Sequence, residues 1–306
     1  TFTLLDNDAG SVGPGGVGVS PVLTLWLRAH DLSDAGFSDG SAVATWPDVS
    51  GSGRDATQSS AGSQPDLQVN ALNERAVLVF DNDHMTLSSG IAATDGTIFA
   101  VVNKTGTNTA SSYRTLLTTD NHILTSEAAN NEDGSVAPDN DPDANEWGGY
   151  YSPPTKTHGA NETIGSSYRL LSHVVREDGS GAYDSDESYT DGGNEQSFTE
   201  GAFSSGLENV VGAGRGFNQN HPGNIAELIH FGVDLNETRR ILVENYLSAK
   251  YGLSLDTGGG ATDVYAGDLG PDGSQGGGDD YDRGVFGVGR LSPSDLHDAA
   301  ETGGLR

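Results

Sequence analysis

The chain has no cysteine, only one methionine, only three lysines and no long apolar run. Without cysteine there are no disulfides, cysteine-ligated zinc sites, iron–sulfur centres or thiol nucleophiles, so any metal ligands must be oxygen atoms or histidines. No segment approaches the roughly 18 apolar residues of a membrane-spanning helix. Membrane insertion is therefore not expected.

Negative charge dominates the composition, with 44 Asp and Glu against 15 Lys and Arg and a formal net charge of -29. This excess repels phosphate backbones, which excludes nucleic acid as a partner. The only lysines are Lys104, Lys156 and Lys250, and the other twelve basic residues are arginine. The composition predicts a halophilic source, because hydrated carboxylates keep a surface soluble in concentrated salt. An acidic, calcium-rich exoprotein from seawater is the alternative.

Localisation is predicted from the start of the sequence. The first residue is Thr1 and not a methionine, which is typical of a chain whose signal peptide has been removed. We expect an extracellular protein that is secreted or attached to the cell surface.

Short β-rich runs recur along the chain, separated by clusters of Gly, Asn, Asp and Ser. The clearest runs are residues 22–27, 42–46, 76–80, 97–102, 168–175 and 225–231. Such runs predict strands, and turn signals between many short strands are typical of an antiparallel sandwich. The fold class expected is an all-β jelly-roll sandwich.

One segment breaks the β pattern and predicts a single amphipathic helix over residues 236–251. Leu242, Tyr246 and Ala249 fall on one stripe of this helix. Asn236 is placed to cap its N-terminus, and Gly252 lies just past its C-terminus. We expect the helix to lie on the sandwich.

Composition divides the chain into four parts. Residues 1–20 are an N-terminal strand and Gly-rich arm, residues 21–256 the sandwich, residues 257–278 a Gly/Asp linker, and residues 279–306 a C-terminal extension that could begin a further module. Because the arm could pair with a sheet edge of its own domain or of a neighbouring molecule, a filament built by strand exchange is an alternative function.

Several motifs resemble concanavalin A-like (laminin-G-like) jelly-roll modules of the branch with unassigned function found in large prokaryotic surface proteins. The resemblance covers roughly residues 14–290. Its motifs include Pro14-Gly15-Gly16-Val17, Leu25-Trp26-Leu27-Arg28-Ala29, Trp46-Pro47-Asp48-Val49-Ser50-Gly51-Ser52-Gly53-Arg54-Asp55, Ile225-Ala226-Glu227-Leu228-Ile229, Tyr246-Leu247-Ser248-Ala249-Lys250-Tyr251-Gly252 and the tail Asp280-Tyr281-Asp282-Arg283-Gly284-Val285-Phe286-Gly287-Val288-Gly289-Arg290. The resemblance implies the fold and leaves the ligand open.

Catalytic patterns are weak. Enzymes that resemble this architecture cleave β-glucans with carboxylates in a Glu-x-Asp-x-x-Glu run, and this chain contains no Glu-x-Asp. Glu227 is interpreted as a structural carboxylate, on the opposite strand face from His230. We therefore predict that the protein is not an enzyme, and a hydrolase whose two carboxylates come from distant strands stays open.

No organic cofactor is expected. Residues 13–18 match a dinucleotide-binding fingerprint, but they lead into a strand where the chemistry requires a helix N-terminus. The eight histidines show no metal-ligating spacing such as His-x-His.

Calcium is the one predicted ion. Two acidic segments place oxygens at alternate positions, one through Asp139, Asp141 and Asp143, the other through Asp184 and Asp186 with Glu195. The second follows the 1, 3, 5, 12 spacing of a calcium loop, although neither has the glycine at position 6. A hydrated acidic loop without an ion is the alternative.

Two asparagines, Asn103 and Asn161, stand in glycosylation sequons and are candidate acceptors. Asn236 stands in a third sequon, where its predicted role as a helix cap competes.

The function predicted is a non-catalytic extracellular surface module for adhesion, glycan binding or matrix assembly. Its partner would be a polysaccharide or cell-surface glycan, or copies of itself. Asp143, Asn145, Trp147, Tyr150 and Tyr151 form an aromatic cluster in a polar segment and are the candidate glycan-binding residues. The alternative is that these aromatic residues only anchor their loop.

Overall fold

The structure is a computed structural model that describes residues 13–18, 22–105, 114–127, 146–151, 156–177, 183–198, 208–214, 217 and 220–255. In parts of strands β9, β10, β11, β13 and β14, only the backbone is described. The first twelve residues of the predicted N-terminal strand and arm, the linker 257–278 and the extension 279–306 lie outside the described residues. The filament hypothesis, which depends on that N-terminal strand, therefore stays a prediction.

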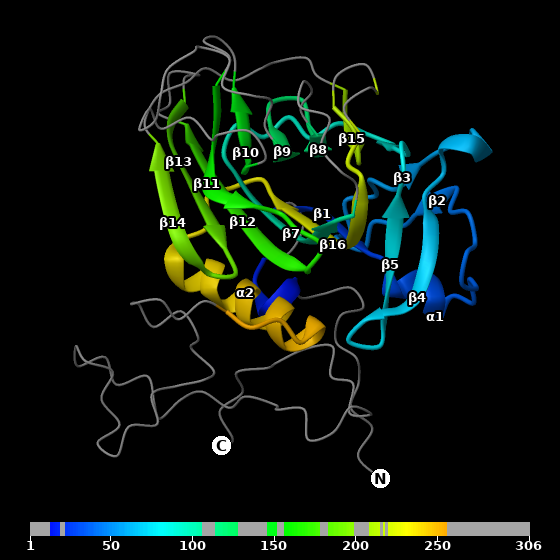
Figure 1. Ribbon diagram of the computed structural model, residues 1–306. Coiled ribbons are helices and arrows are strands. Elements are labelled where there is room, and N and C mark those ends of the chain that lie inside the picture. Colours follow the sequence, from blue (N-terminus) through cyan, green and yellow to red (C-terminus); the bar gives the residue numbers. More distant parts are fainter. Residues whose placement is uncertain are drawn as a thin grey trace, which may run out of the picture.

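Two antiparallel sheets of eight strands each form a sandwich, which confirms the predicted all-β class (Figure 1). In sheet A the order is β14-β13-β12-β7-β16-β5-β4, and β1 also pairs with β16. Its strands are β1 (Leu23–Arg28), β4 (Asp66–Leu72), β5 (Arg75–Phe80), β7 (Gly96–Lys104), β12 (Arg169–Glu177), β13 (Tyr183–Thr190), β14 (Gly193–Phe198) and β16 (Gly223–Phe231).

Sheet B has the order β11-β10-β9-β8-β15-β6-β3-β2. Its strands are β2 (Thr45–Trp46), β3 (Ala56–Thr57), β6 (Met85–Leu87), β8 (Arg114–Thr118), β9 (Ile123–Glu127), β10 (Glu146–Tyr151), β11 (Lys156–Thr163) and β15 (Val210–Val211). Five of the six β-rich runs identified in the sequence closely match β1, β5, β7, β12 and β16, and the run 42–46 overlaps β2 only at its last two residues.

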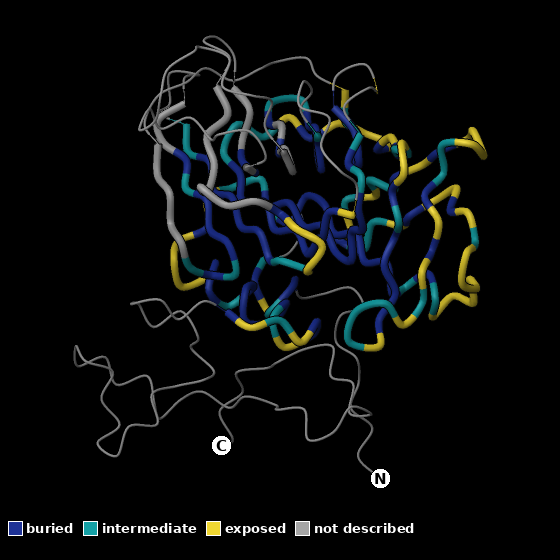
Figure 2. Tube along the Cα trace, viewed as in Figure 1, coloured by how far each residue is buried: buried dark blue, intermediate teal, exposed yellow. Residues whose placement is uncertain are grey.

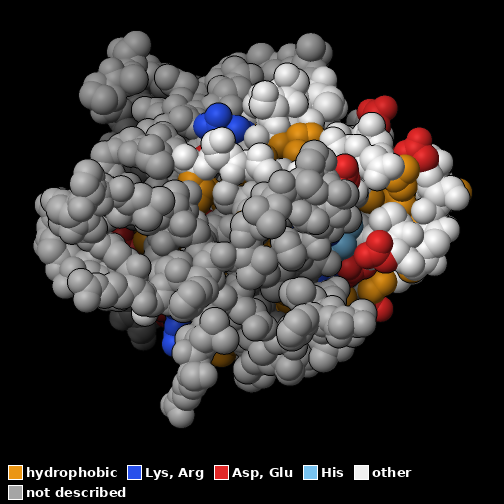
Figure 3. Space-filling view, turned by 90° about the horizontal axis from the view of Figure 1, so that it is seen from below, with side chains coloured by type: hydrophobic (Ala, Val, Ile, Leu, Met, Phe, Trp, Pro, Cys, Tyr) orange, Lys and Arg blue, Asp and Glu red, His pale blue; other side chains and the backbone are white. Residues whose placement is uncertain are grey.

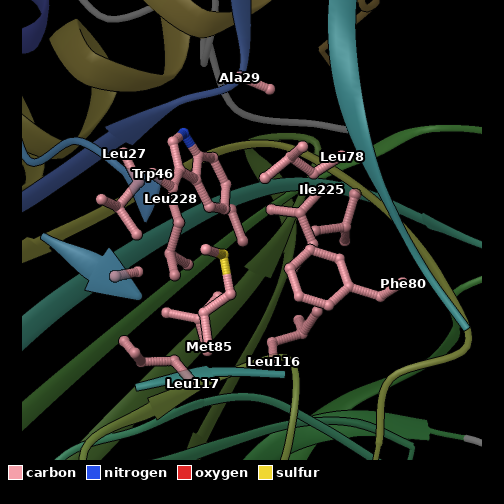
Figure 4. Close-up of a cluster of buried hydrophobic side chains, with 14 of the residues drawn as sticks. Leu27, Ala29, Trp46, Leu78, Phe80, Met85, Leu116, Leu117, Ile225 and Leu228 are labelled. Atoms are coloured by element: carbon pink, nitrogen blue, oxygen red, sulfur yellow. The ribbon is translucent and has the colours of Figure 1, made fainter. Parts of the chain in front are cut away.

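The main hydrophobic core lies between the sheets. Leu78, Ile225 and Leu228 from sheet A meet Met85 and Leu116 from sheet B (Figure 4). Each of these side chains is fully buried. Burying a Leu or Ile side chain contributes roughly 1.5–3 kcal/mol, so this layer supplies much of the stability of the sandwich.

Helix α2 (Glu237–Tyr251) covers the opposite face of sheet A, as the sequence predicted (Figure 1). The Asn236 side chain accepts a hydrogen bond from the Arg239 amide, and Gly252 ends the helix in the left-handed conformation (φ 65°). Such a cap is worth about 1 kcal/mol. The predicted stripe is only partly right, because Tyr246 is buried whereas Ala249 is exposed.

A second core cluster therefore fills the space between sheet A and α2. It contains Trp26, Phe99 and Phe231 from the sheet with Tyr246 and Tyr251 from the helix. Covered on both faces, β7 and β16 are buried along their whole length (Figure 2). This double burial explains why these two strands have long apolar runs.

Two further short elements pack at the edges. The 3-10 helix η1 (Pro14–Gly16) lies against α2, where Gly15 (φ 62°) comes so close that an added Cβ would lie 2.7 Å from the Leu242 carbonyl oxygen. The five-residue helix α1 (His30–Asp34) follows β1 and contacts β4 and β5. The sequence did not indicate α1.

Candidate functional site

Trp147, the centre of the predicted glycan-binding cluster, lies in the core between the sheets. Its side chain is 0% exposed, and its indole Nε1 donates a hydrogen bond to the Thr190 hydroxyl at 3.0 Å. A buried indole cannot stack on a sugar, so the prediction for Trp147 is wrong and the anchoring alternative describes it better. Tyr150 and Tyr151 lie in β10 with undescribed side chains, and Asp143 and Asn145 lie outside the described residues.

The second predicted calcium segment is a β-hairpin and not a loop. Asp184 and Asp186 lie in β13, and Glu195 lies in the paired strand β14. Asp186 is fully buried, with a carboxylate oxygen 3.7 Å from His173 Nε2. The side chains of Asp184 and Glu195 are not described, so calcium binding at this segment stays a prediction. Asp139, Asp141 and Asp143 lie outside the described residues, and calcium there stays a prediction.

The glycosylation prediction fails at Asn103. Its side chain is 4% exposed, donates to the Ser166 carbonyl at 3.1 Å and accepts from the Asn224 amide at 3.0 Å. A side chain held on both sides inside the sheet is not accessible to a glycosyltransferase. Asn161 lies in β11, where its side chain is not described.

Glu227 is the centre of a buried polar network under α2, as the structural interpretation predicted. Its carboxylate accepts hydrogen bonds from Trp26 Nε1 at 2.5 Å and from the Tyr251 hydroxyl at 2.7 Å, and Lys250 Nζ lies 3.0 Å away. Burial, followed by the Glu227 charge, raises the pKa of Tyr251 well above its usual range. His230 lies on the other face of β16, as expected. The network joins helix and sheet, and no substrate can reach it from outside.

A serine, a histidine and an aspartate come together inside the sandwich in a way that their sequence spacing does not show. Strand pairing places His173 opposite Ser188, and His173 Nδ1 lies 2.9 Å from the Ser188 hydroxyl. Asp186 is two residues along β13 and faces His173 Nε2. All three side chains are fully buried. The arrangement is therefore part of the polar interior and is inaccessible to a substrate.

One group of potential metal ligands occurs among the described residues. Atoms of His30, Asp31 and Asp34 lie within 4.8 Å of one another on α1. Arg28 Nε already contacts the Asp31 carboxylate at 2.8 Å. Burial, and then the charges of Lys250, Arg28 and Arg75, lower the pKa of His30. The same positive charges oppose a metal cation, so we assign no ion to this group.

The described surface offers a different aromatic site, at the end of β5. Phe217 is 40% exposed and stacks on the imidazole of His84, with ring centroids 4.6 Å apart and planes inclined by 30°. Among the described residues, the only other large hydrophobic side chain with such exposure is Phe37, at 39%. We call the pair His84 and Phe217 the aromatic platform.

Backbone contacts hold the platform in place. The His84 amide donates to the Ser63 carbonyl at 3.3 Å, and its own carbonyl accepts from Gln58 Nε2 at 2.9 Å. Phe217 has a φ of 58°, and its amide donates a hydrogen bond to the Gly214 carbonyl at 3.0 Å. A positive φ is unfavourable for a bulky residue and costs of order 1–3 kcal/mol. The fold keeps this exposed ring in a strained position.

Two acidic residues stand next to the platform in the chain. Asp81 and Asp83 directly precede His84, and the Asp83 carboxylate accepts a hydrogen bond from the Asp81 amide at 2.8 Å. Burial, and then the nearby charges of Asp66 and Asp81, raise the pKa of Asp83. Burial lowers the pKa of His84, which keeps its ring neutral. The site thus combines an apolar ring face with hydrogen-bond acceptors.

The platform is not evident from the sequence, because its two rings are far apart in the chain. A weak signal was present, since Phe217 ends the run Gly212-Ala213-Gly214-Arg215-Gly216-Phe217 and His84 ends Asp81-Asn82-Asp83-His84. Gly212 allows this approach, because a Cβ there would overlap the Phe80 ring. Glycine at such a crossing lets two chain segments meet closely.

Acidic side chains outnumber basic ones on one face of the described surface. Seen from below, Asp and Glu side chains are frequent there and Lys and Arg are sparse (Figure 3). Two of the three lysines, Lys104 and Lys250, are buried. The described helices include none long and apolar enough to cross a membrane.

No protein-family model and no curated protein matches the chain. Solved structures to which it is similar include domain 4 of an extracellular GH43 arabinanase from Geobacillus stearothermophilus, at 13% identity, covering 71% of this chain and 96% of that one, with a TM-score of 0.49. A second is the Trypanosoma rangeli sialidase, at 13% identity, covering 81% of this chain and 36% of that one, with a TM-score of 0.44. A third is a GH54 α-L-arabinofuranosidase, at 10% identity, covering 77% of this chain and 60% of that one, with a TM-score of 0.47. The chain spans well under two thirds of the sialidase and about three fifths of the arabinofuranosidase.

These neighbours correct two interpretations. Because they come from an arabinanase, a sialidase and an arabinofuranosidase, they contradict the prediction that the chain is not an enzyme. Identities of 10–13% and TM-scores below 0.5 nevertheless assign neither a substrate nor a reaction to this chain. The resemblance to concanavalin A-like modules holds only at the level of an antiparallel β-sandwich.

Proposed function

We propose that this protein recognises carbohydrate outside the cell through the aromatic platform of His84 and Phe217. The observation that carries the proposal is an exposed aromatic ring, held in a strained conformation and stacked on a neutral imidazole beside carboxylates. The C–H face of a sugar ring packs on an aromatic ring, while its hydroxyl groups donate to acceptors at the edge.

Charge supports sugar as the ligand class. The Asp81 and Asp83 carboxylates accept hydrogen bonds from hydroxyl groups, and no ion pair with either is found among the described residues. A net charge of -29 repels other anionic ligands. Uncharged glycans fit both features. Attachment to a polysaccharide or to a glycan-coated surface follows as the role of the molecule.

The test is glycan-array binding by the wild-type chain and two matched variants, with and without calcium. Phe217→Ala removes the phenyl ring of the platform. Phe37→Ala removes an equally exposed phenylalanine elsewhere and serves as the control. We expect the wild type and Phe37→Ala to bind the same glycans, and Phe217→Ala to lose binding at least tenfold.

Equal binding by Phe217→Ala and the wild type would reject the platform as the site. Release of reducing sugar from each bound glycan is measured in parallel, so that recognition and turnover are determined separately. Asp83→Asn then tests the acceptor role of the carboxylate while keeping the size of the side chain.

A further inference from the structure

Two buried histidines face each other across the sandwich. His122 lies in the turn between β8 and β9 of sheet B, and His230 lies near the end of β16 in sheet A. His122 Nδ1 is 3.4 Å from His230 Nε2, and the rings are stacked with centroids 5.7 Å apart. Both side chains are almost fully buried. This pair is a polar contact between the two sheets.

The outer nitrogens of the pair have defined partners. His122 Nε2 lies 2.7 Å from the Thr94 carbonyl oxygen, and a carbonyl only accepts, so this nitrogen carries a proton. His230 Nδ1 lies 2.7 Å from the Thr24 hydroxyl oxygen. That same oxygen lies 2.8 Å from the His230 carbonyl oxygen. The single hydroxyl proton of Thr24 can therefore be donated to either of two acceptors.

With both rings neutral, these three contacts can all be hydrogen bonds. The Thr24 hydroxyl donates to His230 Nδ1, and His230 Nε2–H donates to His122 Nδ1. When one proton enters from bulk water and binds His230 Nδ1, the new N–H donates to the Thr24 oxygen, and the Thr24 hydroxyl turns to the His230 carbonyl. The heavy atoms stay where they are. A second proton would have to bind His122 Nδ1. Both facing nitrogens, which lie 3.4 Å apart, would then carry a hydrogen and could not bond to each other.

We propose that His122, His230 and Thr24 form a proton-binding clasp that takes up one proton without rearrangement and a second only when sheets A and B separate at this end. The clasp is a device built into the fold and is independent of the aromatic platform. Gly96 on β7 leaves room for it, since a Cβ there would lie 2.9 Å from His122 Cε1 and 3.2 Å from His230 Nε2.

The charged groups that face the clasp influence the pH at which it binds protons. Asp95, which precedes β7, favours a proton on His122, and His173 on β12 opposes it. Arg54, in the loop between β2 and β3, opposes a proton on His230 and donates to the Thr24 carbonyl at 3.0 Å. Asp186 on β13 faces His173. Burial lowers the pKa of both clasp histidines, so the clasp responds to acid and not near neutrality.

The test is a histidine-ring nitrogen NMR titration of the full-length chain from pH 8 downward. We expect Nε2–H on His122 at neutral pH, then one titration step shared by both rings that brings one proton while the amide spectrum stays native. Loss of the native spectrum should accompany the second proton. Two independent steps in a folded protein, or unfolding before any proton enters the pair, would overturn the proposal.

Two matched variants at residue 24 sharpen this test. Thr24→Ser keeps the hydroxyl and should titrate like the wild type. Thr24→Val is close in shape but cannot accept from a charged His230, and hydrogen bonds to charged groups are the stronger ones, so we expect proton binding to weaken about tenfold. Equal titration of the two variants would contradict the role of Thr24. His221→Gln, which alters a buried histidine outside the clasp, is the control.

Discussion

The face of sheet A covered by α2 and the region around the aromatic platform differ in how their polar groups are arranged. Under α2, the Glu227 carboxylate is shared by Trp26, Tyr251 and Lys250, all buried. At the loop end, an aromatic ring is held exposed and carboxylates lie near one another without a cation among the described residues.

This difference distinguishes residues that stabilise the fold from residues that a ligand can contact. A buried charge persists only when it is paired and hydrogen-bonded, so the Glu227 network indicates structure. The Phe217 ring is strained and 40% exposed, so its position is better explained by contact with a ligand than by packing alone. Changes at the first region should alter stability, and changes at the second should alter binding.

The largest effect on stability is expected from Glu227→Gln. This change leaves the buried Lys250 without its carboxylate, and breaking one partner of a buried ion pair costs roughly 3–5 kcal/mol. Glu237→Gln, on the exposed first turn of α2, is the control. Adding Lys250→Met to Glu227→Gln should restore part of the loss. Urea unfolding measures all four proteins, and equal stability of the two single variants would contradict the structural role of Glu227.

Acid should weaken the sandwich next. Burial lowers the pKa of His122 to about 4 and that of His221 to about 3, from an ordinary 6.5. The unfolded chain then binds protons that the folded chain does not, so this stability is complete above pH 6.5 and is lost as the pH falls toward 3. His221→Gln should flatten its share of the pH dependence, and an unchanged slope would argue against a neutral buried His221.

Added salt should raise stability moderately, whereas acid lowers it. The carboxylates of the surface repel one another in dilute buffer, and two of the three lysines are buried where they cannot offset that charge. We expect the melting temperature to rise with sodium chloride well past the molar range, beyond ordinary screening. A melting temperature that stops rising near 0.2 M would support ordinary screening and count against a halophilic source.

The smallest effect on stability is expected from Phe217→Gly. Glycine adopts the φ of 58° without strain, which offsets the loss of the ring stack and the added freedom of the unfolded chain. We expect unfolding free energy within about 1 kcal/mol of the wild type. Binding of glycans should nevertheless be lost. A large loss of stability would show that Phe217 serves the core and not the surface.

Sequence reasoning found the elements whose signal is local. The strands of sheet A show as apolar runs because several are buried on both faces, and α2 shows through its cap at Asn236 and its end at Gly252. Strands such as β13, with its acidic Tyr183–Thr190 sequence, were read as a loop. There, tertiary pairing overrides a polar sequence.

For the candidate site, the sequence could predict residue types but not which residues are exposed. The sequence predicted an aromatic residue beside hydrogen-bond acceptors, but Trp147 is buried and Phe217 is exposed because of how the sheets pack. Exposure is a property of the tertiary fold, as is the meeting of His84 with a residue more than a hundred positions away. No spacing in the sequence encodes that contact.

The most direct test of the account is a crossed measurement of binding and stability in two variants with the glycan that binds best on the array. Phe217→Ala should unfold like the wild type and lose binding at least tenfold in titration calorimetry. Glu227→Gln should unfold more readily and, under conditions where it is folded, bind with wild-type affinity. Binding retained by Phe217→Ala, or lost by folded Glu227→Gln, would contradict the division between a structural network and a recognition platform.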